Sequence, residues 1–320
     1  MKMEFTRREF IQKSSMLSAA LPFVPLFSQA NQNAQKQHPD NELEIHIFSK
    51  HLQFLNYNEM AEAAAEMGFA GLDITVRPKG HVLPENAKKD LPKAVKAIKD
   101  AGLKATTITT AISSADEPYT KDILETASDL GINYYRSNWL HYSEEISIPK
   151  AMQSFQTQIK KLSELNKKTG IIGAYQNHSG RYVGAAIWEV WELLKDSNPH
   201  SMGCQYDIRH ATVEGGKSWQ TGLRLIAPKI KTIVLKDFKW MQTDKGWEAV
   251  NVPIGEGMVN FTEYFSLLKK YNIQVPVSLH MEYDLGGAEH GGKDIHIPKE
   301  EIFMKMKKDL NSIQTLWKSV

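Results

Sequence analysis

The feature that most constrains this chain is a regular alternation of short β-rich runs and longer helical patterns. Eight runs rich in β-branched and aromatic residues are separated by segments with apolar residues at helical spacing. The runs cover residues 44–48, 71–75, 105–112, 132–136, 171–176, 203–207, 232–236 and 275–282. Each strand begins roughly 27 to 44 residues after the previous one, which is close to the length of a βαβ unit. Eight such units predict an α/β fold of the (β/α)₈ barrel type.

The segments between the runs support this fold. The predicted helices cover residues 58–67, 89–101, 121–130, 152–168, 261–271 and 299–318. Three of them are followed by a glycine stop signal at Gly68, Gly102 and Gly131. A doubly wound sheet is the alternative, but such a sheet usually carries a glycine-rich phosphate loop after an early strand, and the sequence has none there. We therefore predict one barrel domain over residues 42–320.

The N-terminus has the pattern of an export signal. Adjacent arginines Arg7 and Arg8 precede an apolar run, 16–27, and the small residues that end at Ala30. The run is about twelve residues long, whereas a spanning helix needs about 20. The pattern resembles a twin-arginine signal, which implies a bacterial protein that the twin-arginine translocase exports to the periplasm or beyond. We predict a signal over 1–30 and a flexible polar leader over 31–41; an uncleaved anchor or a disordered arm is the alternative.

Charge and cysteine content exclude several classes. The formal net charge is +2, and residues 1–30 supply it with four basic and two acidic side chains. Without a clustered basic footprint, nucleic acid is not an expected partner. Cys204 is the only cysteine, which excludes an internal disulfide and a thiolate metal cluster, and it is most simply a small buried residue.

Polar residues gather at the predicted carboxyl ends of the strands, where barrel enzymes place their sites. Gln176 and His178 end the fifth strand, Asp207 and His210 follow the sixth, and Lys236 and Trp240 follow the seventh. Glu282 ends the eighth. The oxygens of Gln176, Asp207 and Glu282 would suit a divalent ion such as Mn, Mg, Co or Zn, and such an ion could polarise a sugar carbonyl.

Each of these residues has a structural alternative. Asp207 could cap the helix after its strand, and Glu282 could form a buried structural ion pair with Lys236. Loop residues Arg77, His81 and Arg136 could line a substrate site or simply fix their loops through salt bridges. Trp240 could stack on a sugar ring or pack in the core.

The strand-end motifs together resemble the xylose isomerase-like superfamily of TIM barrels, the sugar phosphate isomerase/epimerase group that includes endonuclease IV. The motifs are Gln176-Asn-His, Asp207-x-x-His210, Lys236-Asp237 and Glu282. In ketose epimerases of this group, a Glu, an Asp, a His and a Glu on strands five to eight bind one metal ion. Here the strand-five position holds Gln176 and the strand-seven position holds Val234, so the resemblance implies a weakened ligand set.

Four other segments resemble a subgroup of barrels linked to 3-keto-sugar chemistry, namely 75–85, 135–136, 236–240 and 252–257. The resemblance implies an isomerase or epimerase that abstracts a proton next to the carbonyl of a small carbohydrate. Our hypothesis for this enzyme has Glu282 as base or metal ligand, Asp207 as ligand, His210 as substrate contact and Lys236 as electrostatic stabiliser. A 3-keto-glycoside lyase or 3-keto-glycal hydratase is the alternative reaction. A non-catalytic sugar-binding barrel is a second alternative, whereas an endonuclease would need a three-metal cluster and a basic surface. The oligomeric state is left open.

Overall fold

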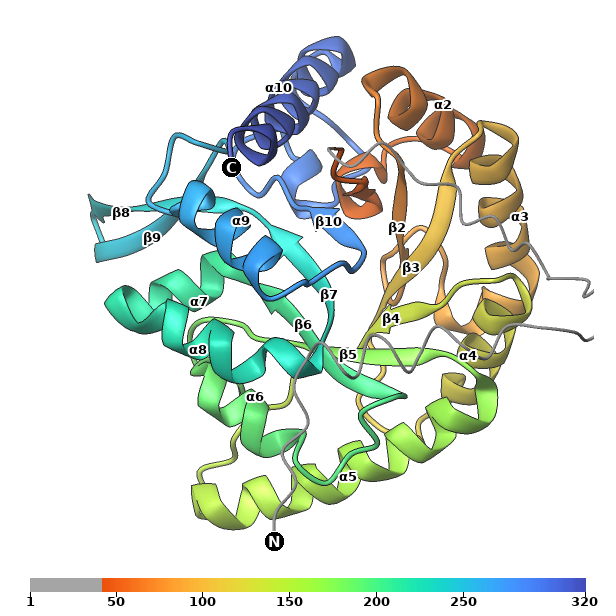
Figure 1. Ribbon diagram of the computed structural model, residues 1–320. Helices are drawn as coiled ribbons and strands as arrows, with labels where there is room; N and C mark the ends of the chain where they lie inside the picture. The colour runs from red at the N-terminus through yellow and green to blue at the C-terminus, as the bar shows by residue number, and fades with distance from the viewer. Residues whose placement is uncertain (1–41) are drawn as a thin grey trace, which may run out of the picture. The chain divides into compact units, whose positions relative to one another are not determined.

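Eight parallel strands close into a barrel, and helices surround it (Figure 1). The computed structural model describes residues 42–320. Around the barrel the strands follow the order β1, β10, β7, β6, β5, β4, β3, β2, and every barrel pairing is parallel. Their bounds are β1 Ile45–Phe48, β2 Gly71–Val76, β3 Lys104–Thr110, β4 Tyr134–Arg136, β5 Ile172–Gln176, β6 Met202–Asp207, β7 Ile230–Leu235 and β10 Val277–Leu279. The predicted barrel is therefore confirmed, and the doubly wound alternative is wrong.

The helices connect successive strands. The α-helices are α2 Tyr57–Met67, α3 Ala87–Asp100, α4 Thr120–Asp129, α5 Ile148–Thr169, α6 Ile187–Leu193, α7 Ile208–Gly215, α8 Trp219–Ile226, α9 Phe261–Lys270 and α10 Lys299–Lys318. Short 3₁₀ turns are η1 Ser49–Leu52, η2 Pro84–Asn86, η3 Gly216–Ser218, η4 Ala227–Lys229 and η5 Ala288–His290. All six predicted helices are present, with ends that differ from the prediction by four residues or fewer.

Local sequence explains where helices begin and end. The side chain of Asn56 accepts hydrogen bonds from the amides of Asn58 and Glu59, and Glu59 bonds back to the Asn56 amide, which forms a capping box at the start of α2. The helix stops at Gly68, whose φ of 96° lies in the left-handed region that glycine tolerates. These caps fix the path of the chain from β1 to β2.

The structure departs from the prediction around the last strands. The predicted eighth strand reaches Glu282, but β10 ends at Leu279. The amide of His280 still bonds to the carbonyl of Leu235 at 2.9 Å, whereas the amide of Met281 turns to Nε2 of His51 at 3.0 Å. Side-chain capture of this amide takes the chain out of the barrel, so Glu282 stands in a loop at the barrel mouth.

A β-hairpin, β8 Asp237–Thr243 with β9 Gly246–Val252, was not expected from the sequence and projects beside α9 (Figure 1). It follows β7 after the single residue Lys236. Four amides, those of Phe238, Gly255, Gly257 and Val259, donate to the buried carboxylate of Asp237. Asp237 therefore organises the loop after the hairpin and does not serve as a site carboxylate.

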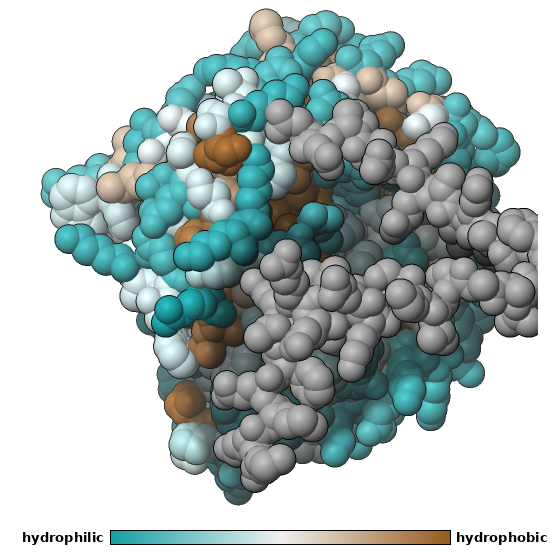
Figure 2. All heavy atoms as spheres, in the orientation of Figure 1, coloured by the Kyte–Doolittle hydropathy of each residue, from teal (hydrophilic) through white to brown (hydrophobic). Residues whose placement is uncertain are grey.

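The apolar core fills the barrel and its contacts with the helices, and Cys204 is buried in β6. The coloured surface in Figure 2 is mostly hydrophilic, with small apolar patches. Among residues 42–320, no helix combines the length and apolarity that crossing a membrane requires. The predicted signal over 1–30 and the leader over 31–41 lie outside the described residues and stay predictions.

Candidate active site

The carboxyl ends of the neighbouring strands β5 and β6 are joined by side-chain hydrogen bonds. Asn177 accepts a hydrogen bond from the amide of Asp207 at 2.8 Å and donates to its carbonyl at 3.0 Å. Gln176 donates through Nε2 to Oδ2 of Asp207 at 2.8 Å, and its Oε1 accepts from Arg136 at 3.2 Å. Because a carboxylate only accepts and a guanidinium only donates, these two neighbours fix the orientation of the Gln176 amide.

Asp207 performs two tasks. Its Oδ1 accepts from the amide of His210 at 3.2 Å and so caps the start of α7, and its Oδ2 faces Lys236 Nζ at 3.1 Å. Burial raises the pKa of Asp207, although Lys236 and the His210 amide favour its ionised form. The capping role and the site role of Asp207 therefore coexist.

Lys236 is the central cation of the site, and its side chain is buried. Its ammonium lies 2.7 Å from Nε2 of His210, 3.1 Å from Asp207 and 3.4 Å from Oε2 of Glu282. Three acceptors match the three N–H groups of an ammonium. Burial and the charge of Lys236 hold the pKa of His210 well below its usual range, so this imidazole is neutral.

Glu282 lies between two lysines. Its Oε1 accepts from Lys50 Nζ at 2.8 Å, and its Oε2 lies 3.4 Å from Lys236 Nζ. Burial alone would raise the pKa of Glu282, but the fields of Lys236 and Lys50 outweigh it and hold the pKa well below the usual range. The side chain keeps 26% of its surface exposed, while Lys236 and Asp207 keep 3% and 0%. Glu282 is therefore a carboxylate that a ligand in the barrel mouth can reach.

These side chains line a small cavity of about 60 Å³ at the barrel mouth. The lining residues come from the ends of six barrel strands and the loops after them: Phe48, Lys50, Arg77, Arg136, Trp139, Gln176, His178, Lys236, His280 and Glu282. Trp139 lies against the guanidinium of Arg136, 4.3 Å from its ring centre. Phe48 stacks on His280 at 4.1 Å.

His178 presents a free ring nitrogen. Its Nδ1 lies 2.9 Å from the carbonyl of Ser179, an acceptor that requires Nδ1 to carry the proton. Nε2 is then the unprotonated nitrogen. The ring packs 3.9 Å from His210 and 4.5 Å from Trp139. Burial and the charge of Lys236 lower the pKa of His178 to about 4, so the ring is neutral and can accept a hydrogen bond from a ligand hydroxyl.

The predicted metal ligands lie together, yet their arrangement does not suit a divalent ion. The Lys236 ammonium lies between the carboxylates of Asp207 and Glu282, where an ion bound by both would have to sit. The side-chain oxygen is the atom of Gln176 that could bind a metal ion, and it already accepts a hydrogen bond from Arg136. In the described part of the chain, no three His, Cys, Asp or Glu side chains are grouped as a metal site. The ligand set of Gln176, Asp207 and Glu282 therefore does not fit a metal ion.

Most of the predicted site residues meet at this mouth. Glu282, Lys236, Arg77, Arg136, His178 and Gln176 line the cavity, and His210 and Asp207 contact Lys236 directly. Two predicted substrate contacts, His81 and Trp240, do not line the mouth cavity. His81 faces a neighbouring cavity and joins the loops after β1 and β2 through Ser49 Oγ and the Leu52 carbonyl, both at 3.2 Å. Trp240 lies on the hairpin strand β8, with 44% of its surface exposed.

Sequence reasoning missed Lys50, which pairs with Glu282. Lys50 stands two residues after the first strand, in η1, and a search of every strand end for charged residues would have found it. His51 supports the same loop, since its Nε2 accepts the Met281 amide.

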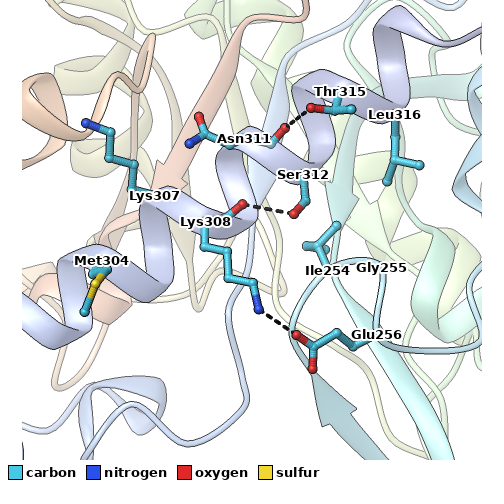
Figure 3. A pocket seen from close by; sticks show the side chains of 10 residues that line it. All are labelled: Ile254, Gly255, Glu256, Met304, Lys307, Lys308, Asn311, Ser312, Thr315 and Leu316. Carbon is cyan, nitrogen blue, oxygen red and sulfur yellow. Dashed lines mark hydrogen bonds and ion pairs between the residues drawn. The ribbon is translucent and has the colours of Figure 1, made fainter.

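A wider groove lies away from the barrel mouth, between α10 and the loop after β9 (Figure 3). Its volume is about 710 Å³, and Lys308 crosses it to reach Glu256 at 2.8 Å. None of the predicted site residues lines this groove. Its lining offers one surface ion pair and short polar side chains, so the groove lacks the clustered chemistry of the barrel mouth.

Comparison with known proteins gives a family and a fold. The family described as Xylose isomerase-like TIM barrel matches residues 61–302. No curated protein sequence matches the chain. Among solved structures, the 3-keto-D-glucoside 4-epimerase of E. coli is 14% identical, with a TM-score of 0.61 over 84% of this chain and 99% of that one. The probable 3-DHS dehydratase of Bacillus anthracis is 15% identical, with a TM-score of 0.60 over 83% and 98%. A xylose isomerase-like TIM barrel protein of Mycobacterium smegmatis, in complex with magnesium, is 12% identical, with a TM-score of 0.60 over 83% and 97%.

Proposed function

This chain belongs to the xylose isomerase-like TIM barrel family, and we propose that it is a sugar-processing enzyme that abstracts a proton from the carbon beside a sugar carbonyl. The observation that carries the proposal is the Lys236 ammonium, held by Asp207 and Glu282 at the floor of the barrel mouth. A fixed cation in a buried site stabilises the oxyanion that forms on the carbonyl oxygen. The epimerase and the dehydratase among the structural neighbours support this class of chemistry.

Glu282 is the proposed base. It is the carboxylate of the cavity lining, and its lowered pKa keeps it ionised at neutral pH. The proton passes from the substrate carbon to Glu282, the C–H electron pair becomes the enediolate double bond, and the carbonyl oxygen takes the negative charge next to Lys236. His178 and Gln176 present neutral polar groups at the cavity, which suit substrate hydroxyls.

The same geometry favours chemistry with one base. A two-base epimerisation needs a second proton acceptor on the opposite face of the carbon, and Gln176 cannot take that proton. Isomerisation needs one base at carbon, Glu282, which returns the proton to the neighbouring carbon while the hydroxyl proton of that carbon passes to the former carbonyl oxygen. The second candidate is elimination, in which the enediolate expels an oxygen substituent from the next carbon, as in a keto-sugar lyase or dehydratase. Among residues 42–320, no second carboxylate lines this cavity. This favours isomerisation and elimination over an epimerisation that inverts the carbon.

Solvent exchange tests the proposal. The protein is incubated with a panel of keto-sugars in D₂O, and NMR follows the replacement of the C–H next to the carbonyl. We expect exchange with at least one sugar and a loss of about 10²–10⁴-fold in Glu282→Gln, the range for removal of a general base. Glu62→Gln, an exposed carboxylate on α2, is the matched control. A protein that binds a sugar with unchanged affinity in Glu282→Gln and never exchanges its protons is a binding barrel, and the proposal is then wrong.

The enzyme is further proposed to act outside the cytoplasm, on the strength of Arg7 and Arg8 in the predicted signal. A fusion of residues 1–41 to a reporter should reach the periplasm of a bacterial host. Replacing both arginines with lysine should retain the reporter in the cytoplasm. Unchanged export after that replacement contradicts a twin-arginine signal.

A further inference from the structure

The mouth cavity has more positive charge than its carboxylates balance. Its lining contains Lys50, Arg77, Arg136 and Lys236, but Glu282 is the one lining carboxylate. Lys50 and Lys236 are both paired, with Glu282 and with Asp207. The two guanidiniums have no such partner, because no carboxylate oxygen lies within 4 Å of either in the part of the chain that the structure describes.

Asp73 lies close enough to feel the charge of both guanidiniums, but it forms an ion pair with neither in the described part of the chain. Its carboxylate accepts from Thr109 Oγ1 at 3.0 and 3.1 Å and from Ser278 Oγ at 2.9 Å. Burial raises the pKa of Asp73 to about 6, so the group is still ionised at neutral pH. The lining therefore holds four cations and one carboxylate, and the buried carboxylates of Asp207 and Asp73 behind it do not balance the difference.

Arg136 is buried to 97% and carries an unmet donor. Its two terminal nitrogens donate to the Gln176 side chain and to the Thr110 carbonyl, at 3.2 and 3.3 Å. Its Nε is buried and has no hydrogen-bond partner among residues 42–320. A buried guanidinium without a counter-ion is expensive, and burial lowers its pKa to about 9. Such a group is normally matched by an anion that the protein does not itself supply.

Arg77 adds a second guanidinium to the same cavity. It is partly exposed and lies over the ring of Phe48, 5.5 Å from its centre. Arg136 lies over Trp139 in the same way, at 4.3 Å. Stacking on aromatic rings orders a guanidinium without using its N–H donors, so both groups remain available to an incoming ligand.

We infer that the natural substrate is a sugar acid, whose carboxylate is bound by Arg136 and Arg77 while its carbonyl faces Lys236. A carboxylate matches the fork of a guanidinium and brings negative charge to a lining in which cations predominate. A phosphate ester would bring close to two negative charges into the same small cavity. The inference rests on the proposed function, because it names the substrate of that site.

Calorimetric titration tests this inference without requiring turnover. A panel pairs each acid with its neutral parent: D-glucuronate with D-glucose, D-galacturonate with D-galactose, and D-gluconate with D-glucitol. D-glucose 6-phosphate covers the phosphate alternative. We expect at least one acid to bind about tenfold or more tightly than its parent, as one charge-assisted hydrogen bond allows. The preference should weaken as salt rises from 50 to 500 mM.

Arginine variants test whether the carboxylate of the bound acid contacts Arg77 and Arg136. Arg77→Gln and Arg136→Gln should each lose the preference for the acid and keep the affinity for the neutral parent. Arg224→Gln, an exposed arginine of α8, should keep both. Arg77→Gln gives the assignment even where Arg136→Gln fails to fold, because Arg77 is partly exposed.

The outcomes separate this inference from the proposed function. The inference is overturned if no acid binds more tightly than its neutral parent, or if the phosphate ester binds more tightly than every acid. It is also overturned if Arg77→Gln still binds the acid more tightly than the neutral parent. Exchange of a neutral keto-sugar without a preference for acids supports the function and overturns the inference. Preferential binding of an acid that never exchanges its protons supports the inference and contradicts the function.

Discussion

The Nζ atom of Lys236 lies 2.7 Å from Nε2 of His210, the shortest of its three polar contacts. A charged lysine can only donate, so Nε2 of His210 accepts in this contact. On the other side of the ring, Nδ1 lies 2.8 Å from the Ser179 hydroxyl and 3.1 Å from Nη1 of Arg209, which also donates to that hydroxyl at 2.9 Å. The position of the ammonium is therefore fixed by a chain of polar contacts that extends to the surface loop after β5.

Lys236→Met tests the role of this ammonium. We expect deuterium exchange to fall by about 10²–10³-fold, the loss typical when a group that stabilises the oxyanion is removed. Stability should also fall, because Asp207 keeps a buried charge without its partner. Thermal unfolding followed by circular dichroism measures this second effect separately. Lys217→Met, an exposed lysine, is the control, and exchange at the wild-type rate in Lys236→Met would contradict the assigned role.

Gln176→Glu places two carboxylates in contact, because the Gln176 amide now donates to Asp207 at 2.8 Å. We expect the free energy of unfolding to fall by about 1–3 kcal/mol, the cost of an unmet buried acceptor, with the new charge pair to Arg136 offsetting part of the repulsion from Asp207. The loss should be smaller at pH 5 than at pH 8, since protonation of one carboxyl restores a donor. Urea unfolding at both pH values, with the exposed Gln153→Glu as control, measures it. An equal free energy of unfolding for wild type and Gln176→Glu at pH 8 would show that this contact is not formed.

The buried carboxyl of Asp309 on α10 predicts a pH effect on stability. Burial raises its pKa from 3.8 to about 7, although the Tyr283 hydroxyl and the Ile254 amide favour the ionised form. The folded state therefore binds more protons than the unfolded state between about pH 4 and pH 7, and stability falls as pH rises through that range.

Asp309→Asn removes this titration and keeps an oxygen for the Ile254 amide, which lies 3.2 Å away. We expect the variant to be more stable than wild type at pH 8, by on the order of 1–3 kcal/mol, and equal to it near pH 4. Denaturant unfolding at the two pH values checks the difference, with the exposed Asp129→Asn as control. A variant that is less stable at pH 8 would show that the carboxylate is stabilised there.

The barrel could be predicted from the sequence because its evidence is local and repeated. Each strand is a short β-rich run, and the helices have apolar faces, three of them with a glycine directly after the predicted end. The position of Glu282 was predicted correctly relative to the other strand ends, yet its place in a loop was not. The Met281 amide is captured by His51, a residue distant in the sequence, and no local pattern records that contact.

The site chemistry was harder to predict for the same reason. Gln176 and Val234 are visible in the sequence as departures from the family pattern, but which atom faces which neighbour depends on three-dimensional contacts. The pairing of Lys50 with Glu282 joins the first and last strands of the barrel. Trp240 follows β7 in sequence, as a strand-end residue should, but the hairpin turns it away from the mouth.

The wild-type site should work without a bound metal ion. The Lys236 ammonium occupies the space between Asp207 and Glu282, so the two carboxylates already have a cation. We expect extensive dialysis against EDTA to leave deuterium exchange unchanged. Titration of wild type with MnCl₂ or ZnCl₂ should give no saturable heat from this site. Lys236→Ala removes the internal cation and leaves two carboxylates and the His210 imidazole, which are ordinary ligands for zinc. This variant should therefore gain a zinc site that is lost again when Asp207→Asn is added. A stoichiometric metal in wild type, released by Asp207→Asn and required for exchange, would show that the lysine yields to a metal ion when one is present.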